Sequence, residues 1–111
     1  MAKVRLATVT EIPEDGMVAR EHDGRRILLA KVEGQVYAMN GTCTHSGAPL
    51  DEGFLGREGG NPFLLTCPWH AAHFDIRTGK VYQETPWARD TETFPVQIEG
   101  GEILLDIPDE G

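Results

Sequence analysis

The feature that most constrains this chain is a pair of short stretches, each of which joins a cysteine to a histidine. The first is Cys43-Thr44-His45 and the second is Cys67-Pro68-Trp69-His70, and together they hold both cysteines and two of the four histidines. Thiolate and imidazole are good ligands for zinc and for iron. Two such pairs can close one tetrahedral zinc site. They can also hold two irons and two sulfides, with Cys on one iron and His on the other.

The spacing of these residues favours the two-iron cluster over the other uses of cysteine. A disulfide is less expected, because each cysteine has a histidine beside it and the chain reads as cytosolic. Zinc fingers with two Cys and two His place the cysteines in one pair and the histidines in the other, whereas both pairs here are mixed. A zinc site nevertheless stays open as the alternative.

The composition fits one small domain with an acidic surface. A chain of 111 residues has the length of a single domain. Its 18 acidic and 10 basic residues give a formal charge of −8. This balance argues against nucleic acid, whose phosphates select basic proteins, and suits association with a basic protein partner.

Neither the apolar runs nor the first residues of the sequence predict contact with a membrane. No apolar run reaches the roughly 20 residues that a membrane-spanning helix requires. Residues 1–5 also lack the apolar region of a secretory signal. We therefore expect a cytoplasmic protein.

The pattern of apolar and turn residues predicts an all-β fold without helices. Strands are expected at residues 4–9, 17–20, 26–32, 35–39, 63–66, 74–76, 80–82, 93–98 and 102–107. Turn signals at Asp23-Gly24, Glu33-Gly34, Thr78-Gly79 and Gly100-Gly101 separate them. The N-terminal strands read as an antiparallel meander, and the whole pattern implies a sandwich or a small barrel.

Both Cys/His pairs are expected in loops. The first pair follows a shift to Gly, Thr, Ser and Pro at Asn40, and the second follows the apolar strand 63–66 directly. Residues 55–62 are rich in glycine and predict an exposed, mobile excursion. We expect two ligand-bearing loops, at about residues 41–53 and 66–80, within one domain that spans residues 1–111.

These motifs resemble the Rieske iron–sulfur proteins, whose pattern is C-x-H, then C-x-x-H, then an aromatic residue, Asp and a Gly turn. Phe74, Asp75 and Gly79 match the last part, and the resemblance covers roughly residues 3–107. It implies a Rieske-like antiparallel β sandwich or barrel with a loop-built subdomain for one [2Fe–2S] cluster. It also implies the ligands, with Cys43 and Cys67 on the inner iron and His45 and His70 on the outer iron.

Departures from the respiratory branch of that family favour its soluble ferredoxin branch. The respiratory branch has an additional, disulfide-bonded cysteine in each loop, and the matching positions here are Ala48 and Trp69. A Ser and a Tyr that donate to cluster sulfurs in that branch are matched by Ala72 and Phe74.

The separation of the two motifs is longer than usual, and the Gly-rich insertion 56–62 accommodates the extra length.

The ligand chemistry and the resemblance together predict an electron carrier and not an enzyme. With two thiolate ligands the oxidised cluster is formally neutral, so adding one electron costs less electrostatic work than in an all-Cys cluster. The resemblance implies transfer from an NAD(P)H-dependent flavin reductase to a terminal oxygenase, such as an aromatic-ring-hydroxylating dioxygenase. The alternatives are a small subunit of a larger reductase, such as assimilatory nitrite reductase, or a zinc-stabilised binding module.

The remaining polar residues of interest are expected outside the ligand set. His73 follows His70 closely, but the ligand count is complete without it, so we expect it beside the ligands or at the surface. His22 is expected to be solvated next to a turn. Asp51 and Glu52 are expected to help steer a basic partner.

Overall fold

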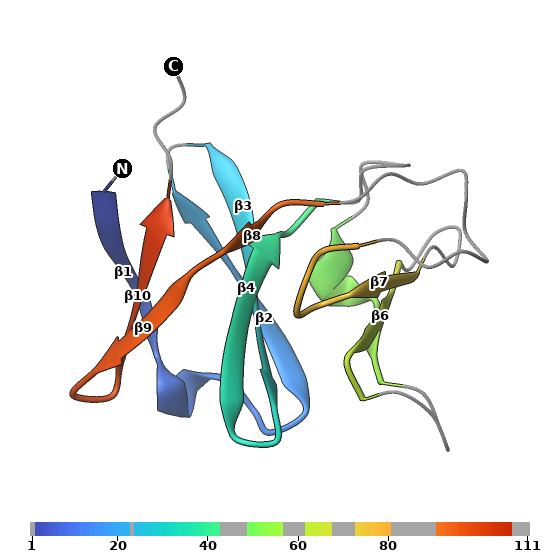
Figure 1. The fold of residues 1–111 in the computed structure, drawn as a ribbon, viewed down its shortest axis with the longest axis horizontal. Helices are drawn as coiled ribbons and strands as arrows, with labels where there is room; N and C mark the ends of the chain where they lie inside the picture. The colour runs from blue at the N-terminus through green and yellow to red at the C-terminus, as the bar shows by residue number, and fades with distance from the viewer. Residues whose placement is uncertain are drawn as a thin grey trace.

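The computed structural model describes residues 2–22, 24–42, 49–56, 62–67, 73–80 and 91–107. In these ranges the chain forms antiparallel sheets and two 3-10 turns without an α-helix, which confirms the predicted all-β class (Figure 1). The strands are β1 (Ala2–Thr8), β2 (Gly16–His22), β3 (Arg25–Val32), β4 (Gln35–Asn40), β5 (Phe54–Leu55), β6 (Leu64–Thr66), β7 (His73–Asp75), β8 (Thr93–Phe94), β9 (Val96–Glu99) and β10 (Glu102–Ile107). The 3-10 turns are η1 (Val9–Glu11) and η2 (Leu50–Glu52). Among the described residues, no helix has the length and apolarity to cross a membrane.

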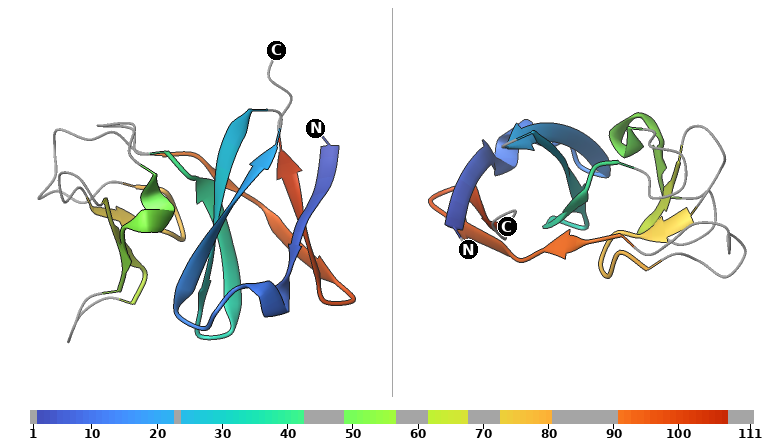
Figure 2. Two further views of the ribbon diagram at one scale, coloured as in Figure 1. Left: turned by 180° about the vertical axis from the view of Figure 1, so that it is seen from behind. Right: turned by 90° about the horizontal axis from the view of Figure 1, so that it is seen from above.

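The strands form three sheets, with the orders β1-β10-β9, β2-β3-β4-β8 and β5-β6-β7. In the view from above in Figure 2, the first two sheets curve around a common interior, and β6 and β7 lie to one side of them. This side also carries η2. The third sheet thus forms a small subdomain attached to a larger barrel-like body, as the sequence predicted for the ligand-bearing part.

The hairpins follow from local turn chemistry. Glu33 and Gly34 have φ values of 53° and 78°, and Val32 pairs with Gln35 across them. Two left-handed residues in a row match the twist of the flanking strands, which is why Glu33-Gly34 reverses the chain tightly. Gly100 and Gly101 do the same between β9 and β10, so both predicted hairpins are confirmed.

The predicted N-terminal meander is only partly right. β2, β3 and β4 pair in sequence order, but β1 pairs with the C-terminal strand β10 and belongs to the other sheet. The chain changes sheet through η1 and the turn at Pro13–Gly16, in which the Gly16 N–H donates to the Pro13 carbonyl at 3.0 Å. Buried Ile12 anchors this crossing in the core.

Three further strand predictions need correction. The single strand expected at 93–98 is split at Pro95, which has no N–H to donate, so β8 pairs with β4 while β9 pairs with β10. The exposed excursion expected from residue 55 does not include Leu55, because Phe54 and Leu55 form β5 against β6, and residues 57–61 lie outside the described ranges. Lys80 is not in a strand, and residues 81–82 lie outside the described ranges.

Strand β3 lies between two hydrophobic cores. Ile27 and Leu29 face one core, shared with β10, whereas Leu28 and Ala30 face the other, shared with β6 and β7. All four side chains are fully buried. Burial on both faces explains why β3 is a continuous apolar run and not an alternating one. The second core also fixes the small subdomain to the larger body.

Candidate metal centre

The structure describes one of the four predicted ligands. Cys67 lies within the described residues, whereas Cys43, His45 and His70 lie outside them, as do Ala48, Trp69 and Ala72. The geometry of the four-ligand set is therefore a prediction. The strands and turns that flank the predicted ligand positions are described, and they show what supports those positions.

Cys67 occupies a buried and well-supported position. It follows β6 directly, is 2% exposed, and packs in the same core as Leu65 and Phe74. Leu65 and Cys67 are two residues apart, so strand alternation directs both toward that core. A buried thiol at the end of a paired strand fits a structural thiolate ligand, and together with a second thiolate and two imidazoles it provides the donors of a two-iron, two-sulfur cluster.

The two segments predicted to bear the ligands are flanked in the same way. Thr42 and Pro49, on either side of residues 43–48, form an antiparallel bridge, and Thr66 and His73, on either side of residues 67–72, form a strand pair. Each segment has six residues between its flanking pair and begins with its cysteine. This similarity was not predicted from the sequence, although the threonine that precedes each cysteine is a signal for it.

The aromatic–Asp–Gly signature has a structural explanation. Phe74 is fully buried opposite Leu65, and the Asp75 carboxylate accepts hydrogen bonds from the backbone N–H of Arg77 at 2.8 Å and from its Nη2 at 2.9 Å. Gly79 has a φ of 76°, and a Cβ there would lie 2.1 Å from the carbonyl oxygen of Thr91. The signature therefore builds the turn after β7 and places it against the chain that leads into β8.

The pKa of Asp75 lies below its usual range. Burial raises this pKa, but the hydrogen bonds from the side chain and backbone of Arg77, together with its positive charge, lower it by more. The contacts with Arg77 therefore favour the ionised form of Asp75.

Gly53 connects the first ligand-bearing segment to the second. It ends η2 in an extended conformation, and a Cβ at this position would lie only 2.0 Å from the carbonyl oxygen of Thr66. Thr66 immediately precedes Cys67. The residues around Gly53 in the sequence do not indicate this contact, because Thr66 is distant along the chain.

The predictions about surface residues have different outcomes. Asp51 is ion-paired, since its Oδ1 accepts hydrogen bonds from Arg26 Nε at 2.9 Å and Nη2 at 2.7 Å, and its side chain is 16% exposed. Its part in steering a partner stays a prediction. Glu52 is exposed, as expected. His22 is half-buried at the end of β2 rather than solvated.

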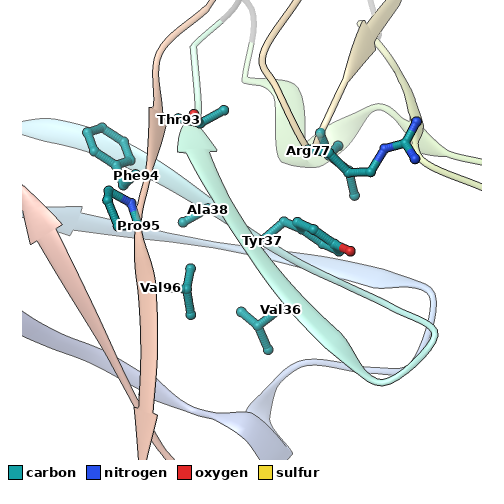
Figure 3. A pocket seen from close by; sticks show the side chains of 9 residues that line it. Val36, Tyr37, Ala38, Arg77, Thr93, Phe94, Pro95 and Val96 are labelled. Carbon is teal, nitrogen blue, oxygen red and sulfur yellow. The ribbon is translucent and has the colours of Figure 1, made fainter.

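A hollow of about 410 Å³ lies between the larger body and the turn after β7. Figure 3 shows Tyr37 and Ala38 of β4 on one side, the Phe94–Val96 crossover on another, and Arg77 at the edge. Cys67 is not among its lining residues. The hollow is thus separate from the described part of the metal centre.

Comparison with known proteins agrees with this architecture. The sequence profile of the Rieske [2Fe-2S] domain matches residues 2–95. The ferredoxin component of the naphthalene 1,2-dioxygenase/salicylate 5-hydroxylase systems of Ralstonia sp is 40% identical over 103 residues, 92% of each chain. The ferredoxin component of the naphthalene 1,2-dioxygenase system of Pseudomonas aeruginosa is 37% identical over 98 residues, 87% of this chain and 88% of the relative.

A solved structure gives the same picture in three dimensions. The ferredoxin of carbazole 1,9a-dioxygenase from Nocardioides aromaticivorans IC177 superimposes with a TM-score of 0.83 at 30% identity. The match covers 95% of this chain and 97% of that ferredoxin. The likeness therefore extends over the larger body and the small subdomain together.

Proposed function

Because the chain belongs to the Rieske [2Fe-2S] domain family, we propose that it is a one-electron carrier, the ferredoxin component of a multicomponent oxygenase. The observation that carries this proposal is the complete double Cys/His motif in a chain that matches dioxygenase ferredoxins over nearly its whole length. A cluster with mixed thiolate and imidazole ligation supplies reversible one-electron transfer when it is bound. The chain itself contributes the ligands and a rigid support for them.

We propose that one cluster is held by Cys43, Cys67, His45 and His70, within a single domain spanning residues 1–111. The buried position of Cys67 at the end of β6 supports its role as a ligand to the inner iron. The matching pairs that flank residues 43–48 and 67–72 support equivalent roles for the two cysteines. His73 stays outside the set because the double motif supplies four ligands without it, and its Nδ1 is hydrogen-bonded to Thr66 Oγ1 at 3.0 Å.

The proposed donor is an NAD(P)H-dependent flavin reductase and the proposed acceptor is a terminal oxygenase, in the manner of the dioxygenase systems to which the relatives belong. A donor that uses NAD(P)H implies that the carrier works in the cytoplasm. The names of these relatives favour a carrier over a nitrite reductase subunit. A zinc module is disfavoured because the family is defined by its iron–sulfur cluster.

The visible spectrum, with iron and acid-labile sulfide analysis, tests this proposal. We expect a coloured protein with two irons and two sulfides per chain. Alanine at any one of the four ligand positions should abolish the coloured centre, because a metal site on loops contributes folding free energy directly. His73→Ala is the control for the ligand count and should still assemble two irons and two sulfides per chain. A colourless wild-type protein containing one zinc would refute the proposal.

A further inference from the structure

We propose that Thr66 and His73 are positioning residues for Cys67, and that their side-chain hydrogen bond fixes the end of β6, which Cys67 follows directly. This inference rests on the proposed cluster function. Thr66 and His73 face each other as the last pair of β6 and β7, directly before Cys67 on one strand. A hydrogen bond of 3.0 Å joins Thr66 Oγ1 and His73 Nδ1 across this pair.

The register of the sheet places this hydrogen bond at the ends of two strands. β6 ends at Thr66 and β7 begins at His73, so the distance between these two residues fixes the separation of the two strand ends. Cys67 follows Thr66 directly, with no residue between them. A change in the position of Thr66 is therefore passed directly to Cys67.

Thr66 is held from both sides. Across one edge it pairs with His73, and across the other it pairs with Phe54 of β5. Gly53, which precedes Phe54, approaches the Thr66 carbonyl so closely that a Cβ would lie 2.0 Å from it. The chain that leaves the first ligand-bearing segment and the chain that leaves the second thus both contact the residue before Cys67.

The other flanking pair lacks this hydrogen bond. Thr42 faces Pro49, whose side chain has no donor or acceptor, and the only hydrogen bond of Thr42 among the described residues runs from its backbone N–H to Asn40 Oδ1 at 3.2 Å. The two segments have the same length, and only the second flanking pair is joined by a side-chain hydrogen bond. Thr42 therefore provides a matched control for Thr66.

The test is the rate at which the holoprotein loses its visible absorbance in an excess of an iron chelator. Thr66→Val removes the hydroxyl and keeps the shape of the side chain, so we expect cluster loss to accelerate about two- to twelvefold, the range that one net hydrogen bond spans. Thr66→Ser should restore the wild-type rate, and Thr42→Val should leave it unchanged. The His73→Asn variant should lose its cluster more slowly than the His73→Leu variant, because the amide of asparagine can replace Nδ1 in the hydrogen bond to Thr66.

Hydrogen exchange separates positioning from general destabilisation. In Thr66→Val, the amides of β6 and β7 should exchange faster, while those of β3 keep their wild-type protection. Equal acceleration in β3, a Thr66→Val rate equal to that of the wild type, or failure of Thr66→Ser to restore it would overturn the inference. Each of these results leaves the proposed function intact, because the wild-type protein still carries its cluster.

Discussion

Replacing Gly53 by alanine puts a methyl group where the structure has no room for one. The new Cβ would lie 2.0 Å from the carbonyl oxygen of Thr66, whereas real Cβ atoms essentially never come within 3.0 Å of such an atom. The obstacle is backbone and not the end of a flexible side chain. Either the chain after η2 or the end of β6 must therefore move by about 1 Å, the difference between these two distances.

The cost of this movement can be set against the entropy gain of the substitution. Overpacking of a well-packed site costs about 1–3 kcal/mol, and a backbone obstacle places Gly53→Ala at the upper end. Gly53 has a φ of −84°, which alanine adopts freely, so the reduced freedom of the unfolded chain returns about 0.4–1 kcal/mol. The net loss is about 2 kcal/mol, which lowers Tm by about 8 °C for a domain of this size.

Thermal unfolding of the holoprotein, followed by far-ultraviolet circular dichroism, measures this loss. Gly16→Ala is the control, since its Cβ would lie 3.0 Å from two ring carbons of Pro13 and 3.1 Å from the Pro13 carbonyl oxygen, so a movement of only a few tenths of an ångström would relieve the contact. We expect the Tm of Gly16→Ala within about 2 °C of the wild type, because the steric cost of the contact with Pro13 and the lower entropy of the unfolded chain nearly cancel. If Gly53→Ala had the same Tm as Gly16→Ala, the Thr66 carbonyl could move at little cost. Gly53 would then not hold Thr66, the residue before Cys67, in place.

Two further predictions concern the charges near the site. The pKa of Asp75 is lowered on folding, so its contribution to stability is present above the unfolded pKa and is lost as pH falls through the folded pKa. In Asp75→Asn, the free energy of unfolding measured by urea titration should therefore fall less steeply with decreasing pH than in the wild type. An unchanged pH dependence would contradict the role of Arg77 as the partner of Asp75. At low salt, Glu52→Gln should slow association with a basic redox partner more than Asp51→Asn does, because Arg26 already neutralises Asp51. Stopped-flow mixing measures both association rates. Equal effects of the two substitutions would show that the Arg26–Asp51 ion pair does not matter for steering.

The amino-acid sequence by itself determined the features that depend on neighbouring residues. Cys67 and His70 are recognisable as a ligand pair because the two residue types and their spacing carry the chemistry. The reversal at Glu33-Gly34 is equally local, since glycine tolerates the left-handed conformation that a two-residue hairpin requires. The predicted all-β class and most strand positions follow from the same kind of short-range pattern.

Only the tertiary structure decided the features that join distant parts of the chain. The pairing of β1 with β10, the burial of β3 on both faces and the neutralisation of Asp51 by Arg26 each depend on residues far apart in sequence. Gly53 illustrates the reason most clearly. Its sequence neighbours indicate a turn, but the space it must leave empty is set by Thr66, which reaches it only when β5 pairs with β6.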